Sequence, residues 1–356
     1  MKYFTVGPSE LYPIVPSKIK QALKDGVLSI SHRARIFDEL FESTTNNLRT
    51  LLSIPKKHSI FFLSSGTEGM ERIIQNMAKQ KTLHLVNGAF AKKFYQIALQ
   101  LKKDPLKIEV EYGKSFDWKE LSIPRSTELV CVTQNETSTG VAIDLKQIYT
   151  LKRKNPKVLF AVDVVSSIPY VTVDYSKIDA VFFSVQKGFG LPAGLGVLIV
   201  SPAAISKSLS LEKQYLSTGS YHSFSSLKKN ADKYETPETP NILDIYLLNE
   251  VVKDMLNKGI DLMRKETEEK AKYIETFVEK SRELSYLAEN SEIYSKTVHV
   301  LKVNGGAKQL MEHLKKHGFL ISSGYGAMKN DYVRIANFPA HTIDNLEKLV
   351  DCLSSI

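Results

Sequence analysis

The sequence predicts an α/β fold: a large domain with a mostly parallel seven-stranded sheet flanked by helices, followed by a smaller C-terminal α+β domain. Three observations predict it. The length of 356 residues suggests about two domains. The middle of the chain alternates short apolar runs with helical patterns, and the character of the sequence changes after about residue 245. We expect the large domain at 15–245 and the small domain at 246–356, together with residues 1–14.

Seven short runs of β-branched or apolar residues predict the strands of the large sheet. Several are apolar nearly throughout, as strands covered on both faces are. Helical patterns lie between many of them, for example at 68–78 and 91–101, and this alternation favours parallel strands. The predicted strands are 59–63, 83–86, 108–111, 129–133, 158–162, 180–184 and 196–200.

The C-terminal part has a different pattern. Residues 242–283 are rich in Glu and Lys and carry an apolar stripe that includes Ala271, Ile274 and Phe277, which predicts one or two linking helices. Shorter elements follow and form the small domain. They are a strand at 298–303, a helix near 307–316, a strand at 332–336 and a last helix from Asp344.

Composition excludes several classes of protein. Hydrophobic residues make up 43% and charged residues 24% of the chain, which is typical of a folded globular protein. No apolar run reaches the ~18 residues of a membrane span, and the first residues carry no export signature. The two cysteines, Cys131 and Cys352, form no CxxC pair, so we expect no disulfide scaffold and no metal site. The sequence therefore predicts a cytoplasmic protein without a membrane partner.

The net charge of +9 raises the question of nucleic acid binding. The basic clusters at 152–154 and 228–229 are short and separate, and no basic stretch is interleaved with aromatic residues. Dispersed charge of this kind is typical of a solvated surface that attracts anionic metabolites. We expect no nucleic-acid partner.

Ligands of open α/β sheets bind beyond the carboxyl ends of the strands. After the first predicted strand, Ser64–Gly69 read Ser-Ser-Gly-Thr-Glu-Gly and run into an amphipathic helix. Small residues at a helix N-terminus expose N–H groups in a positive dipole field, which predicts a cradle for phosphate or carboxylate. An N-cap by Ser65 or Thr67 explains the same pattern. Glu68 adds negative charge in the first turn, and the sequence leaves open whether it turns outward.

Two charged residues follow later strands. Asp163 ends a buried run, where a carboxylate needs a cation such as a metal or a protonated ring nitrogen, unless it is a helix cap. Lys187 follows the next strand in a glycine-rich loop, where a desolvated amine can form a Schiff base with a carbonyl; a surface charge is the alternative. An anion cradle, a carboxylate and a lysine on successive strand ends are the groups that a pyridoxal phosphate site needs.

With these motifs, the sequence resembles the class V branch of the fold-type I pyridoxal phosphate aminotransferases over nearly its whole length. The most specific stretches are Ser184–Lys187, read Ser-Val-Gln-Lys, and 192–194, read Pro-Ala-Gly. The resemblance implies that Lys187 is the Schiff-base lysine and that Asp163 contacts the pyridinium nitrogen. It also implies a homodimer with shared active sites. The remaining cofactor contacts that it implies are Ser65, Gly66, Thr67 and Gln186 at the phosphate, Thr137 at the ring hydroxyl, Phe90 stacked on the ring, and Thr236 reaching the phosphate in the partner subunit.

On the substrate side, Arg334 is similar to the family's arginine for the α-carboxylate, since a guanidinium binds a carboxylate with two hydrogen bonds. An exposed arginine on a strand is the alternative. Ser9, in the opening Gly-Pro-Ser, and the pair His32 and Arg33 resemble the phosphoserine aminotransferase subfamily, in which the His-Arg pair meets the substrate phosphate. A similar segment occurs in alanine–glyoxylate aminotransferases.

Two features depart from the phosphoserine subfamily. Its second His-Arg pair is replaced by 324–329, where Lys329 offers only a point charge, and the Lys187 loop is closer to the broad class V pattern. Cysteine desulfurases are disfavoured: Gln186 stands where they carry a histidine, and Cys131 and Cys352 lie in predicted regular elements.

The resemblance implies a phosphoserine:2-oxoglutarate aminotransferase of serine biosynthesis, acting by ping-pong amino transfer between a small amino acid and a 2-oxo acid. The alternative is an alanine/serine–glyoxylate (pyruvate) type aminotransferase.

Overall fold

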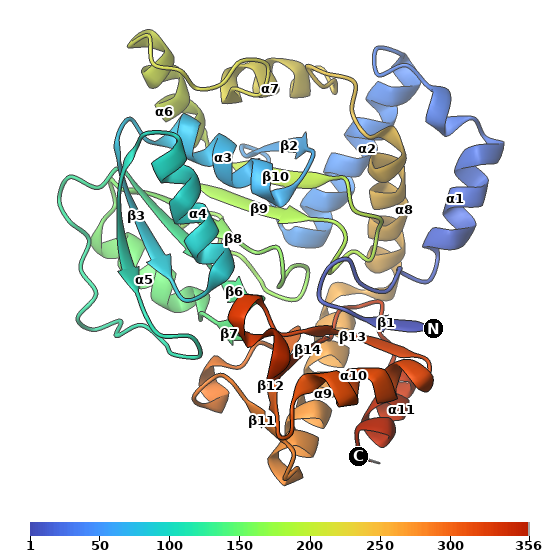
Figure 1. The fold of residues 1–356 in the computed structure, drawn as a ribbon. Helices are drawn as coiled ribbons and strands as arrows, with labels where there is room; N and C mark the ends of the chain where they lie inside the picture. The colour runs from blue at the N-terminus through green and yellow to red at the C-terminus, as the bar shows by residue number, and fades with distance from the viewer. Residues whose placement is uncertain (355–356) are drawn as a thin grey trace.

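The computed structural model describes residues 1–354. Its large sheet has seven strands in the order β2-β10-β9-β8-β5-β3-β4 (Figure 1). Only β10 runs against its neighbours β2 and β9, so the predicted mostly parallel sheet is confirmed. The strands are β2 (Ser59–Leu63), β3 (Lys81–Val86), β4 (Asp104–Glu109), β5 (Leu129–Thr133), β8 (Leu159–Asp163), β9 (Ala180–Ser184) and β10 (Gly196–Val200).

Helices cover both faces of this sheet, which explains why its central strands are apolar throughout. In β10, Val197 and Ile199 pack into one core, whereas Leu198 and Val200 pack into the other. The first core lies under α2 (Arg35–Leu52), α5 (Leu145–Lys154) and α8 (Ile242–Lys258), and the second under α3 (Gly66–Met77), α4 (Ala89–Gln100), α6 (Pro202–Lys213) and α7 (Phe224–Ala231).

The smaller sheet has the order β1-β13-β14-β12-β11. The N-terminal strand β1 pairs in parallel with β13, more than three hundred residues later. Figure 1 shows this blue strand beside the red C-terminal elements. The strands are β1 (Lys2–Phe4), β11 (Leu284–Tyr286), β12 (Val298–Val303), β13 (Phe319–Ser323) and β14 (Tyr332–Ala336), and the helices are α9 (Ile260–Lys280), α10 (Ala307–Lys316) and α11 (Ile343–Ser354).

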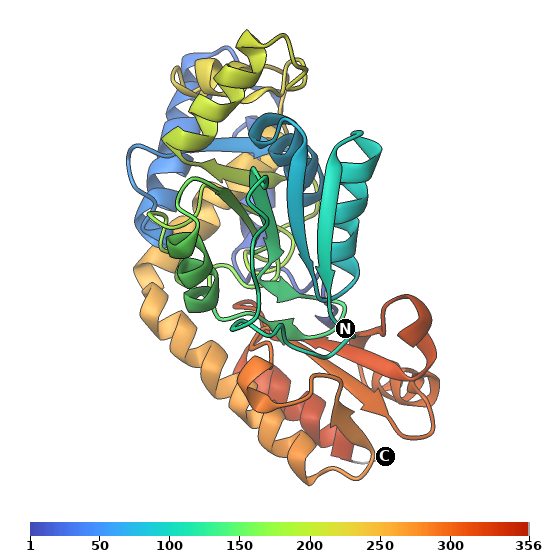
Figure 2. The same ribbon diagram turned by 90° about the vertical axis from the view of Figure 1, so that its left-hand side faces the viewer.

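The linking segment forms two helices, α8 and α9, which meet at Gly259. This residue has a φ of +89°, a conformation that glycine adopts without steric cost. In Figure 2 the two helices run along one side of the molecule from the large sheet to the small one. The remaining elements are α1 (Val15–Lys24), the hairpin β6 (Asn135–Glu136) and β7 (Val141–Ala142), and the 3₁₀ turns η1 (Val27–Ser29), η2 (Ser291–Ile293) and η3 (Gly326–Asn330).

One predicted strand is displaced, and five strands of the described residues were not predicted. The strand expected at 108–111 runs instead from Asp104 to Glu109, because β4 is a half-exposed edge strand whose polar residues mask its start. The unpredicted strands are β1, β6, β7, β11 and β13, and all of them except β13 have only two or three residues. Within residues 1–354, no helix has the length and apolar character needed to cross a bilayer.

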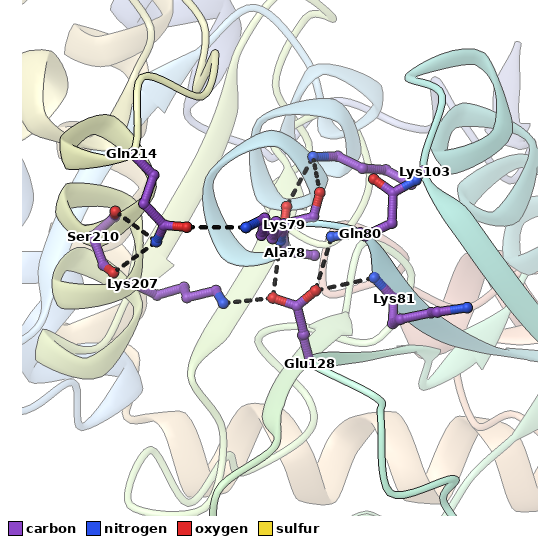
Figure 3. Close-up of polar contacts among 9 residues, drawn as sticks. All are labelled: Ala78, Lys79, Gln80, Lys81, Lys103, Glu128, Lys207, Ser210 and Gln214. Atoms are coloured by element: carbon purple, nitrogen blue, oxygen red, sulfur yellow. Dashed lines mark hydrogen bonds and ion pairs between the residues drawn. The ribbon is translucent and has the colours of Figure 1, made fainter.

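A half-buried carboxylate joins the segments that lead into β3 and β5 at the amino ends of these strands (Figure 3). Glu128 precedes β5 and accepts the backbone N–H groups of Lys79, Gln80 and Lys81 at 2.8–3.0 Å. The ammonium of Lys207 on α6 contacts the same carboxylate. These four donors hold its pKa at about 2: burial raises the pKa, but Lys207 and the backbone groups lower it more.

Candidate active site

A cavity of about 260 Å³ lies at the carboxyl ends of β2, β5, β8 and β9, where β13 and β14 of the small sheet meet the large one. It brings together residues from distant parts of the chain. Nine residues named from the sequence line it: Ser65, Gly66, Thr67, Phe90, Thr137, Asp163, Gln186, Lys187 and Arg334.

Lys187 is buried in this cavity, with 6% of its surface exposed. Its Nζ donates to Ser166 Oγ at 2.8 Å and Thr137 Oγ1 at 3.0 Å, and lies 5.4 Å from the centre of the Phe90 ring. Burial lowers the pKa of the amine, while Asp163 and Glu136 oppose that shift. A lysine with a lowered pKa supplies the free amine that a nucleophile or proton carrier needs.

The N-terminal segment packs directly on this lysine. A Cβ at Gly7 would lie 2.7 Å from Lys187 Cε, and Gly7 has a φ of +142°. Only glycine therefore fits where the segment crosses the cavity.

Asp163 is the last residue of β8 and is also buried. It accepts the N–H of Val165 at 2.8 Å. Burial raises its pKa, while Val165 N–H and the Lys187 charge lower it. Because its charge is so poorly compensated, this carboxylate fits a protonated ring nitrogen beside it.

The turn after β2 both caps α3 and faces the cavity. Ser65 Oγ accepts Glu68 N–H at 3.1 Å, so the N-cap expected as an alternative is present. Gly66 N–H donates to Ser184 Oγ at 2.8 Å. Thr67 is exposed beside them in the single chain. The first turn of α3 is thus placed to hold an anion.

Glu68 points away from this turn. Its Oε2 accepts from Ser64 N–H at 2.8 Å and Ser64 Oγ at 2.7 Å, and its Oε1 contacts His222 Nδ1. Burial raises the pKa of Glu68, but His222 and Ser64 lower it more, to about 2. The negative charge in the first turn is therefore neutralised by His222 and does not oppose an anion.

Arg334 enters from the small sheet. Its Nε donates to Ser323 O at 2.8 Å, and its guanidinium lies 5.6 Å from the centre of the Tyr325 ring. Tyr325 in turn lies 5.4 Å from the Phe90 ring. Burial lowers the pKa of Arg334. These contacts fix the plane of a guanidinium that lines the same cavity as Lys187.

Four residues named for the site lie outside the cavity of their own chain. Arg33 Nη1 donates to Thr236 O at 2.9 Å and contacts the Glu235 carboxylate, with half-buried His32 next to it in the chain. Thr236 Oγ1 donates to Glu238 O at 2.7 Å. Ser9 lies next to the cavity lining, because its N–H donates to the backbone oxygen of Gln186 at 3.2 Å.

Lys329 also lies outside the cavity. It is exposed on η3 and lines a separate groove with Lys308 and Lys315.

The sequence did not identify several cavity residues. Ser166 Oγ accepts a hydrogen bond from the Lys187 amine. Tyr325, which lies in the 324–329 segment, packs against the Arg334 guanidinium. Asn135 Nδ2 donates to Ser166 O at 3.0 Å and Thr297 Oγ1 at 2.7 Å, which joins the two sheets. The only available signal was their position after a strand end, and many residues share that position.

Glu136 is a further residue that the sequence did not identify, and it is fully buried. Its Oε2 accepts the N–H groups of Phe90 at 3.0 Å and Ala91 at 2.9 Å, at the first turn of α4. Its Oε1 accepts Ser138 N–H at 3.0 Å and Ser138 Oγ at 2.7 Å. This carboxylate therefore fixes Phe90 against the cavity.

Comparison with known families agrees with this geometry. The sequence model of the family "Aminotransferase class-V" matches residues 4–346. The chain belongs to the class V aminotransferases. It is 43% identical to a phosphoserine aminotransferase of Cytophaga hutchinsonii of known structure, which superimposes with a TM-score of 0.98 over 99% of this chain and 98% of the other.

Two further relatives are more distant. An uncharacterized aminotransferase of Methanocaldococcus jannaschii is 32% identical over 73% of this chain and 68% of its own. A phosphoserine aminotransferase of Rhodococcus opacus is 25% identical over 99% of this chain and 95% of its own.

This class V aminotransferase is a pyridoxal phosphate enzyme. The cavity fits that cofactor: the poorly compensated Asp163 suits the protonated ring nitrogen, and the Ser65–Thr67 turn, with Glu68 neutralised, suits the phosphate.

Proposed function

We propose that the protein is a phosphoserine:2-oxoglutarate aminotransferase. The observation that carries the proposal is the 43% identity, over nearly the whole of both chains, to the Cytophaga hutchinsonii phosphoserine aminotransferase. Lys187 and Arg334, which line the same cavity, supply the two groups that amino transfer from an amino acid needs. Small-molecule amino acids and 2-oxo acids are its substrates.

Bound pyridoxal phosphate supplies a carbonyl for the substrate's amino group and a ring that accepts electrons released at the α-carbon. Arg334 binds the α-carboxylate with its guanidinium plane fixed by Ser323 and Tyr325. Lys187 Nζ, with its lowered pKa, takes and returns the α-proton, and Ser166 and Thr137 aim it. Asp163 holds a proton at the ring nitrogen. The donor and acceptor use the same groups in turn, so ping-pong kinetics are expected.

The proposal includes a homodimer with shared active sites. Arg33 and Thr236 lie together, away from the cavity of their own chain, and Thr67 is exposed at its anion-binding turn. In the proposed dimer, Arg33 and His32 bind the substrate phosphate and Thr236 the cofactor phosphate of the neighbouring site.

An experiment with hybrid dimers tests the sharing. Lys187→Ala and Arg33→Ala homodimers should each be inactive toward phosphoserine. A hybrid of the two subunits should regain activity, because one of its sites combines an intact Lys187 with an intact Arg33 from the other subunit. An inactive hybrid would show that each chain uses its own Arg33.

The alternative is an alanine/serine–glyoxylate (pyruvate) type aminotransferase. It is favoured by the exposed position of Lys329, outside the cavity, where the phosphoserine subfamily has a second basic pair. Absorbance of the holoenzyme, titrated with glutamate and then with phosphoserine, alanine or serine, separates the two. A visible band that responds to glutamate and phosphoserine is expected. A band that responds to alanine or serine and ignores phosphoserine would establish the alternative.

A further inference from the structure

A charged histidine lies between two carboxylates from different segments, outside the catalytic groups described above. His222 Nδ1 contacts the Glu68 carboxylate, and its Nε2 is 2.9 Å from Glu238 Oε2. The His222 side chain is only 6% exposed. Burial lowers its pKa, but Glu238 and Glu68 raise it more, to about 9. The raised pKa keeps His222 positively charged at neutral pH, in an ion pair with Glu68 on one side and 2.9 Å from Glu238 on the other.

Each carboxylate is attached to a different part of the proposed shared site. Glu68 lies in the first turn of α3, next to the Ser65–Thr67 turn, and also accepts from Ser64. Glu238 offers its backbone oxygen to Thr236 Oγ1 at 2.7 Å. Thr236 offers its own backbone oxygen to Arg33 at 2.9 Å. A continuous series of contacts thus runs from the anion-binding turn of one cavity to Arg33.

We propose that His222 is a positioning residue that couples the anion-binding turn of its own subunit to the segment carrying Thr236 and Arg33. Through that segment it acts on the neighbouring subunit's site, so the inference rests on the shared active sites of the proposed function. Without His222, Glu68 keeps only its hydrogen bonds from Ser64, and its negative charge, on the residue that follows Thr67, is no longer balanced by a cation. At the same time, Glu238 loses its ion pair with His222, which is one of the contacts that hold the Thr236 segment in place.

The proposal predicts two separable effects of His222→Gln. In the same subunit, the affinity for pyridoxal phosphate should fall about tenfold, because coupling energies in such charged networks correspond to that factor. In the neighbouring subunit, KM for phosphoserine should rise by about the same factor, with kcat changed less.

Hybrid dimers isolate the second effect. A subunit carrying both Lys187→Ala and His222→Gln is paired with a wild-type subunit, so that the live site uses the wild-type Lys187 and borrows Arg33 and Thr236 from the His222→Gln subunit. The reference hybrid carries Lys187→Ala alone. A KM for phosphoserine about tenfold above the reference is expected. An unchanged KM would overturn the inference.

Two further variants keep the test decisive. Glu238→Ala removes only the contact between His222 and the Thr236 segment, at a side chain 30% exposed, and should reproduce the change in KM even if His222→Gln fails to fold. Asp179→Asn is the matched control, because Asp179 is a buried carboxylate paired with Lys152 at 2.8 Å and has no contact with the cavity residues. It should lower the melting temperature and leave cofactor affinity and KM unchanged. Equal losses of cofactor affinity in Asp179→Asn and His222→Gln would reduce His222 to a stabilising role and overturn the inference.

The outcome is distinguishable from failure of the proposed function. An inactive Lys187→Ala and Arg33→Ala hybrid overturns shared sites and this inference together. An active hybrid of that kind with no effect of His222→Gln across the dimer overturns the inference alone. If the wild-type protein does not turn over phosphoserine, the proposed substrate is wrong. The affinity of His222→Gln for pyridoxal phosphate then still tests whether His222 acts on the anion-binding turn through Glu68.

Discussion

At the scale of single residues, burial sets the protonation of the two groups that matter most. It lowers the pKa of Lys187 and raises that of Asp163, because a low dielectric disfavours both charges. The two shifts bring an amine and a carboxylic acid toward the same pH range. A lysine that is readily uncharged and a carboxylate that needs a cationic neighbour are then present in one cavity, ready for the cofactor.

Lys187→Ala should abolish the visible band of the bound cofactor and lower kcat by at least about 10²–10⁴-fold, because the proposed function assigns the transfer of the α-proton to Lys187. Absorbance spectra and single-turnover assays measure the two effects. A variant that keeps the yellow band and the rate would rule out Lys187 as the reactive amine.

Glu136→Gln should loosen Phe90, because an amide cannot accept all four of the N–H and O–H groups that the carboxylate accepts. We expect a loss of unfolding free energy of about 1–3 kcal/mol and weaker cofactor binding. Chemical denaturation and cofactor titration measure these changes. If the variant is destabilised but its cofactor affinity is unchanged, Glu136 stabilises the fold and does not contribute to cofactor binding.

Some residues of the site could be predicted from the sequence, and others could not. Lys187, Asp163 and the Ser65–Thr67 turn follow strand ends, and strand ends can be read from apolar runs. Ser166 and Tyr325 could not be assigned, because their roles depend on contacts with residues from other segments. The contact of Arg33 with Thr236 joins positions about two hundred residues apart, and a single sequence contains no signal for such a pairing.

At the scale of elements, the local sequence pattern predicts strands that are buried on both faces and misses strands that are short or exposed. β9 and β10 were predicted at their observed bounds because every residue is buried. β4 was displaced, and β1 was missed, because edge strands mix polar with apolar residues. Sheet order depends on pairings between distant segments, so the insertion of antiparallel β10 between β2 and β9 was outside the reach of local pattern.

The cluster around Glu128 makes a prediction at this scale, since it joins β3, β5 and α6 (Figure 3). The folded-state pKa of about 2 lies below the ordinary value of 4.5, so this stabilisation is present above pH 4.5 and is lost as the pH falls toward 2. Glu128→Gln should lower the free energy of unfolding at pH 7. Between pH 4.5 and pH 2, the free energy of unfolding should fall less in this variant than in the wild type. Denaturant unfolding at several pH values tests it; parallel curves for the two proteins would contradict it.

At the scale of the whole molecule, the cavity is complete only where the two sheets meet. Lys187 belongs to the large sheet, whereas Arg334 belongs to the small one. Thr297 immediately precedes β12, whose Val300 pairs with Arg334, and its Oγ1 accepts from Asn135 Nδ2 at 2.7 Å and donates to Ser166 O. A short route of contacts therefore joins the partner of the lysine to the strand that carries the arginine.

Thr297→Val should weaken this junction while keeping the shape of the side chain. We expect KM for the amino-acid substrate to rise several-fold, corresponding to about 1 kcal/mol, with a smaller change in kcat. Steady-state kinetics of the holoenzyme measures both. A lowered kcat with unchanged KM would show that the junction acts on Lys187 and not on the placement of Arg334.

The pairing of β1 with β13 has a consequence for biosynthesis. The amino end of a growing chain leaves the ribosome first, so residues 2–4 cannot pair until residues 319–323 have been made. Gly7, which packs on Lys187, follows the same strand and is held from the same edge. The nascent chain can assemble its large sheet early, but it closes the wall over Lys187 only after residues 319–323 have been made. We therefore expect cofactor capture to wait until β13 has formed and β1 has paired with it.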